Sequence, residues 1–381
     1  MRIAFVCKRR YMGKDVILDQ YARLYEIPRQ LALLGHTVLA VCLDYRQDTE
    51  AGCWEHEAAP GHLVWEAHSP GWLGHALPAY PWRVLKRLQG FLPDIVIGAS
   101  DIPQLVLGAW LARHLRVPFV ADLYDNFEGF GQARIPGMVS LLRHAVRRAS
   151  LVLTTSEPLR CFVEDVYRPA GDVIAMPSSV DKHVFHPRDR LACREALGLP
   201  LHAKLFGTAG GLHADKGVTT LYAAWERLRN KIPDAHLVLA GPHAASLPPP
   251  DGPRVHYLGA LSHDRVAHLF GALDVGAICI LDTVFGRYCF PQKAYEMLAC
   301  GLPVVAADVG AMGELLAHTP ECLYRAEDAD DLARRVEQQM ASPVVPNLPI
   351  KDWRELIGDA EPRLRSLVPG EATRAGDTTR V

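Results

Sequence analysis

The chain has 381 residues, of which 49% are hydrophobic and 22% charged, the balance of a globular protein with room for two domains. Its 41 Lys and Arg residues nearly cancel its 43 Asp and Glu residues, which argues against a dedicated nucleic-acid-binding protein. No apolar run reaches the roughly 20 residues of a membrane-spanning helix. The cysteines include no CxxC pair and several lie in apolar runs, so we expect reduced thiols in a cytoplasmic protein.

Strand-like and helix-like segments alternate through the first half of the chain. The apolar run at 3–7 is too short for a signal-peptide core and predicts a buried strand. Residues 21–34 have helical spacing and end at Gly35, a residue that commonly follows a helix. Continuous apolar strands between amphipathic helices predict a parallel sheet covered on both faces. The further strands are expected at 37–43, 95–97, 119–121 and 151–154, and the further helices at 104–115 and 138–149.

The alternation pauses at residues 181–200, which we interpret as a linker, and then restarts. The expected strands of the second half are 205–207, 236–240, 255–258, 275–280 and 304–306, with helices at 219–231, 264–272, 292–299 and 330–340.

The whole pattern predicts an α/β fold of two doubly wound Rossmann-like domains, residues 1–180 and 201–345, that face each other across a cleft. A C-terminal helix at 349–366 is expected to pack back on the N-terminal domain. Residues 369–381 are small, polar and charged, and we expect a disordered tail.

The most informative stretch lies between Pro291, which suits the first turn of a helix, and Gly301, which suits a helix end. The free N–H groups at the start of such a helix favour phosphate or sugar oxygens. Lys293 and Glu296 are spaced to share one face of this helix. A cation suits a diphosphate, and a carboxylate that accepts two hydrogen bonds suits the diol of a ribose.

A glycine-rich loop at 207–217 follows a predicted strand and precedes a helix. Gly210 and Gly211 allow the backbone to approach a ligand, and Lys216 offers a cation. Asp215 stands where a Walker A loop has a glycine, which argues against an NTPase. The loop also lacks the GxGxxG pattern of dinucleotide dehydrogenases.

These segments resemble the retaining glycosyltransferases of family 4, which have the GT-B fold. The segment around Glu296 carries the resemblance, and landmarks in the same order extend it over most of the chain. The matching residues are Gly35-His36-Thr37-Val38, Asp94-Ile95-Val96, Pro177, Val180-Asp181, Phe185, Pro187, Lys216-Gly217, Phe290, Glu296, Ala299, Gly301 and Pro303-Val304-Val305.

The resemblance implies a donor site in the second domain, where Glu296 binds the nucleotide ribose and Lys216 clamps the diphosphate. Backbone groups of the loop at 257–262 would contact the base. Tyr288 stands where the family has a Glu that contacts the transferred sugar, and a glycine replaces an Arg, for which Arg287 is a candidate substitute. The expected donor-binding residues are Gly210, Gly211, Lys216, Gly259, Leu261, Tyr288, Phe290, Gln292, Lys293 and Glu296.

The first domain is expected to hold the acceptor. Polar residues follow the strand at 119–121, and Asp125 fits the acidic member of a His-Asp pair while Tyr124 replaces the His. Asp122, Tyr124 and Asp125 either orient an acceptor hydroxyl or cap the next helix. The loop at 8–14 is unusually basic, and we expect it to meet a phosphate-bearing acceptor or the donor diphosphate.

The resemblance implies transfer of a sugar from a nucleotide sugar to the hydroxyl of a glycan, a lipid-linked acceptor or a small molecule, with retention. Lys216 and Lys293 would stabilise the leaving diphosphate without a metal. With Asp125 and Tyr124 they form the expected catalytic set. A nucleotide-sugar epimerase or hydrolase, or a non-catalytic nucleotide-sugar-binding paralogue, remain alternatives.

Two segments, 80–88 and 141–148, mix basic and apolar residues at helical spacing. Such helices either sit on anionic lipid or bury their apolar face in the core. The first interpretation adds peripheral contact with the inner membrane face and a lipid-linked acceptor; the second leaves a purely cytoplasmic protein.

Overall fold

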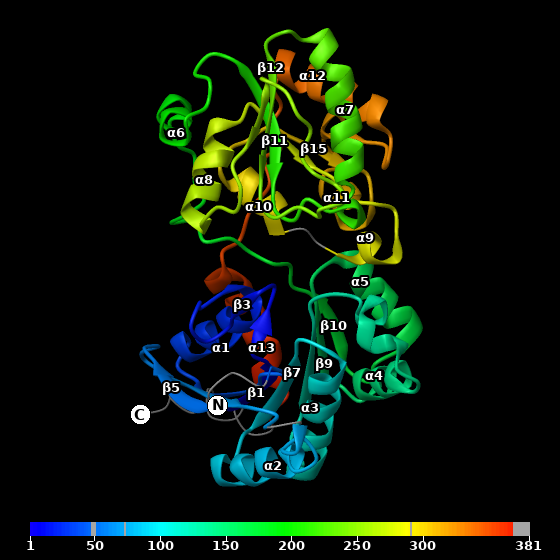
Figure 1. The fold of residues 1–381 in the computed structure, drawn as a ribbon. Coiled ribbons are helices and arrows are strands. Elements are labelled where there is room, and N and C mark those ends of the chain that lie inside the picture. Colours follow the sequence, from blue (N-terminus) through cyan, green and yellow to red (C-terminus); the bar gives the residue numbers. More distant parts are fainter. Residues whose placement is uncertain (47–50, 72–73, 290–291, 369–381) are drawn as a thin grey trace, which may run out of the picture. The chain divides into compact units, whose positions relative to one another are not determined.

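The computed structural model describes residues 1–46, 51–71, 74–289 and 292–368. The chain divides into two compact units (Figure 1). Unit 1 comprises Met1–Ser178 and the C-terminal segment that begins at Trp353, and unit 2 comprises Ser179–Asp352. Each unit contains a twisted, mainly parallel sheet with helices packed on it, which confirms the predicted α/β class with two Rossmann-like domains.

The sheet of unit 1 has eight strands in the order β10-β9-β8-β7-β1-β4-β6-β5. Neighbouring strands are parallel except β5 and β6. The bounds are β1 Arg2–Lys8, β4 Thr37–Leu43, β5 Gly52–His56, β6 His62–His68, β7 Ile95–Ala99, β8 Phe119–Leu123, β9 Leu151–Thr154 and β10 Asp172–Ala175, beside a hairpin of β2 Arg10–Tyr11 and β3 Lys14–Asp15.

One edge of this sheet, the β5–β6 pair, departs from the predicted parallel arrangement. Strands β5 and β6 are separated by a short loop, and parallel neighbours would need a longer crossover connection. Strand β5 is largely exposed, so it lacks the continuous apolar run by which the buried strands are recognised.

The helices of unit 1 form two groups. α1 and α13 pack on each other, and α3 packs against α2 and α4. Leu31 of α1 and Trp353 of α13 share a core with Ile3 and Phe5 of β1. The bounds are α1 Ala22–Leu33, α2 Tyr80–Phe91, α3 Ile102–Leu115, α4 Met138–Arg147, α5 Glu157–Phe162 and α13 Trp353–Ser366, with single turns η2 Phe127–Gly129, η3 Gly131–Arg134 and η4 Val163–Tyr167.

The sheet of unit 2 has six parallel strands in the order β13-β12-β11-β14-β15-β16. Their bounds are β11 Lys204–Ala209, β12 Ala235–Ala240, β13 Val255–Tyr257, β14 Val275–Ile278, β15 Val304–Ala307 and β16 Leu323–Tyr324. Helices α7 and α12 pack together, while α8 packs with α6 and α10 (Figure 1). Their bounds are α6 Arg190–Leu197, α7 Val218–Lys231, α8 His263–Ala272, α9 Val284–Tyr288, α10 Gln292–Ala299, α11 Gly310–Leu315 and α12 Ala329–Ala341, with turns η5 Ala214–Lys216 and η6 Pro320–Cys322.

Residues 181–200, interpreted above as a linker, belong to unit 2 and contain helix α6. Asp189 caps this helix by accepting from the Ala192 N–H. Arg194 is buried and donates to the Ala272 carbonyl at 2.9 Å and to the Asp274 carboxylate at 2.8 Å. A buried arginine therefore shares the buried face of α6 with Cys193 and Leu197.

No helix in the described part of the chain is long and apolar enough to cross a membrane. The predicted tail at 369–381 lies outside the described residues.

Candidate active site

In unit 2, the loop after β11 lies directly against α10. Gly210 has a φ of +121°, and a Cβ added there would lie 3.1 Å from the Lys293 ammonium nitrogen. On the other side, the Gly210 N–H donates to the Ala240 carbonyl at 2.9 Å, and a Cβ on Gly241 would overlap the Gly210 carbonyl. The positive φ favours glycine at 210 and the overlap requires it at 241, and the Gly210 backbone is left open beside an ammonium group.

Lys216 and Lys293 bring two positive charges to this loop. The Lys216 ammonium lies over the Phe285 ring, 4.1 Å from its centroid, and is otherwise exposed. Burial lowers the pKa of Lys293, and nearby Lys216 lowers it further, while Cys279 and Glu296 oppose the shift. Within the described residues, neither ammonium forms an ion pair with a carboxylate. Two such cations beside an open glycine backbone form a setting that attracts a multiply charged anion.

Glu296 lies further along α10, with only 8% of its surface exposed. His263, the first residue of α8, places Nε2 3.6 Å from Glu296 Oε1. His263 was not among the residues predicted from the sequence; its position just after the predicted base-binding loop at 257–262 was the available signal.

The loops that follow β11, β12 and β13 are joined by backbone hydrogen bonds. Beyond the Gly210 bond to Ala240, the Gly241 N–H donates to the Gly259 carbonyl at 2.7 Å. Gly259 has a φ of +66°, and Leu261 is half-buried against the unit 2 core. The predicted base-binding loop and the glycine loop thus form one connected edge.

The other predicted donor residues lie at the end of α9 and the start of α10, close in sequence to Lys293. Tyr288 ends α9 and is half-buried, and Gln292 begins α10. Phe290, with Pro291, lies outside the described residues. Arg287, the suggested substitute for the missing arginine, donates to Asp282 at 2.6 Å, so its charge is already balanced.

In unit 1, the structure distinguishes Asp122, which forms a buried ion pair, from the other expected acceptor residues. Asp122 is fully buried and pairs with Arg23 of α1 at 2.6 Å, while Arg23 also donates to the Met176 carbonyl. This pair ties α1 to the sheet, so Asp122 has a structural role. Asp125 is buried and accepts from the Asn126 N–H at 2.7 Å.

Tyr124 is half-buried at the carboxyl end of β8, and its hydroxyl accepts from Lys8 Nζ at 3.2 Å. Burial raises the pKa of Tyr124 and lowers that of Lys8, the latter opposed by Asp101. Tyr45 donates to the Asp101 carboxylate at 2.9 Å. Asp101 and Tyr45 were not among the residues predicted from the sequence. Both follow predicted strands, β7 and β4, whose carboxyl ends lie at the same edge of the unit 1 sheet as that of β8.

The basic loop at 8–14 carries less free charge than its sequence indicates. Buried Arg9 pairs with Asp15 at 2.9 Å, and Arg10 pairs with Asp44 at 3.2 Å. This pairing leaves Lys8 and Lys14 as the cations of the loop that have no carboxylate partner among the described residues.

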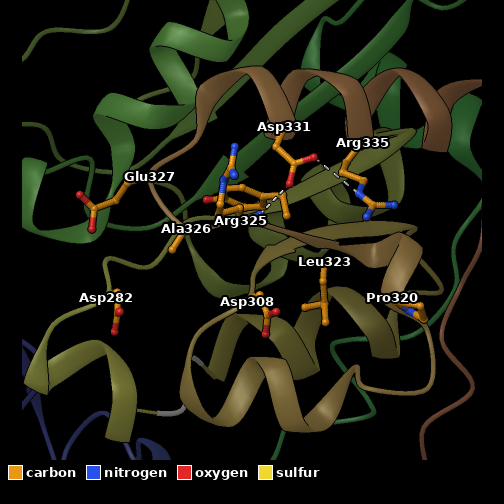
Figure 2. A pocket seen from close by; sticks show the side chains of 10 residues that line it. Asp282, Asp308, Pro320, Leu323, Arg325, Ala326, Glu327, Asp331 and Arg335 are labelled. Atoms are coloured by element: carbon orange, nitrogen blue, oxygen red, sulfur yellow. Dashed lines mark hydrogen bonds and ion pairs between the residues drawn. The ribbon is translucent and has the colours of Figure 1, made fainter.

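Unit 2 also contains a polar pocket of about 670 Å³, lined by Asp282, Asp308, Pro320, Leu323, Tyr324, Arg325, Ala326, Glu327, Asp331 and Arg335 (Figure 2). Asp331 accepts from the Arg325 N–H at 2.8 Å and lies 3.9 Å from Arg335 Nε. The pocket borders β16, at the sheet edge opposite β13, and includes none of the predicted donor residues.

Two family models match the chain. Residues 21–178 match the glycosyl transferase 4-like domain, and residues 203–342 match glycosyl transferases group 1. A D-inositol 3-phosphate glycosyltransferase of Stackebrandtia nassauensis is 32% identical over 210 residues, covering 50% of this chain and 45% of the relative. A D-inositol 3-phosphate glycosyltransferase of Mycobacterium bovis is 35% identical over 174 residues, covering 42% of this chain and 34% of the relative. The matches thus span less than half of each relative's length.

Solved structures share the fold over nearly the full chain. Sucrose-phosphate synthase from Thermosynechococcus elongatus has a TM-score of 0.68 at 19% identity, covering 99% of this chain and 98% of that chain. Anabaena HepE in complex with UDP-glucose has a TM-score of 0.67 at 20% identity, covering 96% of this chain and 100% of that chain. At such identities the likeness establishes the two-domain GT-B architecture.

Proposed function

We propose that this chain, a member of the glycosyl transferases group 1 family, transfers a sugar from a nucleotide-sugar donor to an acceptor hydroxyl. The pairing of Lys216 and Lys293 beside Gly210 carries the proposal. A leaving nucleoside diphosphate gains negative charge as the sugar–phosphate bond breaks, and fixed cations stabilise that charge. The UDP-glucose bound by the similar HepE structure supports a uridine nucleotide sugar as the first donor to test.

The two ammonium groups can supply the positive charge that a divalent cation supplies elsewhere, so we propose transfer without a metal. Retention of the anomeric configuration follows from the family resemblance. In this scheme Glu296 binds the ribose, the 259–261 loop contacts the base, and Tyr288 lies on the side of the transferred sugar.

On the acceptor side, Tyr124 and Asp125 of unit 1 orient the attacking hydroxyl. The Lys8 contact holds the Tyr124 hydroxyl in place. Because Arg9 and Arg10 are paired with carboxylates, the edge favours a neutral sugar hydroxyl, free or lipid-linked, over an acceptor phosphate.

A cytoplasmic location with peripheral contact to the inner membrane face is a separate proposal. Trp82 on α2 and Leu141 on α4 are 61% and 48% exposed, although most apolar residues of both helices face the core. We expect Trp82→Ala to weaken sedimentation with vesicles of anionic lipid. Equal sedimentation of both proteins would overturn this contact.

Calorimetry with UDP, GDP and ADP tests the donor site, and incubation with the matching sugar nucleotides tests turnover. A transferase binds one of these diphosphates and releases it from its sugar nucleotide only when an acceptor is added. Donor consumption without an acceptor would favour the epimerase or hydrolase. Binding without turnover across a panel of sugar and lipid-linked acceptors would favour the non-catalytic paralogue.

A further inference from the structure

We infer that His263 is the positioning residue that holds the Glu296 carboxylate for the nucleotide ribose. The inference rests on the proposed function and adds a residue to its donor site. It begins from one contact: His263 Nε2 lies 3.6 Å from Glu296 Oε1. Within the described residues, His263 is the only side chain in ion-pair range of Glu296.

The contact joins two helices. Glu296 lies inside α10 with its side chain 10% exposed, and His263 begins α8 with its side chain 47% exposed. A buried carboxylate needs partners for its oxygens. At 3.6 Å the imidazole lies against the carboxylate without occupying it with a short hydrogen bond. The oxygens therefore stay available to accept from two hydroxyl groups of a ribose.

The imidazole also contacts an aromatic ring. The Phe185 ring meets His263 edge to face, with centroids 5.0 Å apart, and also packs 6.2 Å from Phe270 of α8. Phe185 is only 1% exposed. It comes from the turn-rich segment before α6, which thereby contributes an aromatic support to the site. Phe185, His263 and Glu296 form a chain of contacts that runs from the core to the proposed ribose.

The consequence is selective recognition of the ribose hydroxyls. Removing the imidazole leaves the carboxylate in place but frees its orientation, so hydrogen bonds to the diol weaken while contacts to diphosphate and base persist. We expect His263→Ala to lower affinity for a ribonucleoside diphosphate about tenfold, the scale of one hydrogen bond to a charged group. The 2′,3′-dideoxy form should lose less than about twofold, because it makes no such bonds.

Calorimetry tests this with UDP, GDP and ADP on the full chain, followed by the 2′,3′-dideoxy form of the tightest binder. The parent protein should bind the ribonucleoside diphosphate much more tightly than its 2′,3′-dideoxy form. This preference should be nearly absent in both His263→Ala and Glu296→Gln. In the double variant the two effects should not add. His263→Gln, which restores a polar group, should recover part of the preference.

His268→Ala is the matched control, because His268 lies on the same helix and bonds its own Asp264 carbonyl. It should leave the preference unchanged. Equal losses for both nucleotide forms in His263→Ala, or no loss at all, would overturn the inference while leaving the donor site intact. If the parent binds none of the three diphosphates, the proposed function and the inference both fail.

Discussion

The carboxyl ends of the two sheets differ in how their cationic side chains are paired, although Lys8 of unit 1 contacts Tyr124 and has no carboxylate partner among the described residues. In unit 1, Arg9, Arg10 and Arg23 are each matched by a carboxylate. In unit 2, Lys216 and Lys293 stand beside an open glycine loop, and within the described chain neither forms an ion pair. Both edges follow from the same strand–helix alternation, so the fold does not decide which one binds an anion. From the pairing of the charges we propose that the diphosphate binds in unit 2 and a neutral acceptor hydroxyl in unit 1.

The largest effect should come from breaking the buried pair of unit 1. Asp122→Ala leaves the Arg23 guanidinium buried without its counter-ion, and we expect the free energy of unfolding to fall by about 3–5 kcal/mol. Chemical denaturation measures the loss, with Asp172→Ala, which breaks an exposed pair with Arg363, as the control. A loss equal to that of the control would mean that this edge is not held together by its charges.

Next in size is the loss of a cation from unit 2. We expect Lys293→Met to lower affinity for a nucleoside diphosphate by about ten- to a hundredfold, since bonds to charged groups contribute about 1.5–3 kcal/mol. Affinity for the uncharged nucleoside should hardly change. Lys231→Met removes a surface ammonium that pairs with Glu337 and serves as the control in calorimetry. Equal weakening of nucleoside and diphosphate would show that Lys293 contributes packing rather than charge.

A smaller effect is expected from closing the glycine loop. Gly210→Ala places a methyl group against the Lys293 ammonium, so diphosphate affinity should fall about tenfold. Gly252→Ala is the matched control, because Gly252 has a φ of +136° but nothing within 4 Å of an added Cβ. Both variants should lose about 1 kcal/mol of stability from backbone strain. If both also lose affinity equally, the effect comes from strain and not from the site.

The smallest effect concerns Tyr124, one of the proposed acceptor residues at the carboxyl end of the unit 1 sheet. Tyr124→Phe removes the hydroxyl that accepts from Lys8, and we expect a roughly five- to tenfold drop in transfer rate. Diphosphate affinity should stay unchanged, because the contact lies within unit 1. Loss of nucleotide binding in this variant would contradict the assignment of separate roles to the two edges.

The sequence predicts the parts of this structure that depend on local pattern. The buried strands of unit 2 are continuous apolar runs, and helix α10 ends at a glycine, so both were located closely. Helix α6 was missed because it is only eight residues long and follows a turn-rich segment, and one of its three buried side chains is an arginine. Arg10 meets Asp44, and His263 meets Glu296, across distances in the chain that no local pattern encodes. The same holds for the pocket in Figure 2, whose lining comes from several separate segments.

A crystal structure of the chain with the nucleoside diphosphate that binds most tightly tests the central claim directly. We expect phosphate oxygens within hydrogen-bond distance of both the Lys216 and Lys293 ammonium groups, with the ribose against Glu296. A diphosphate bound in the pocket beside Arg325 and Arg335, or at the acceptor edge of unit 1, would contradict it.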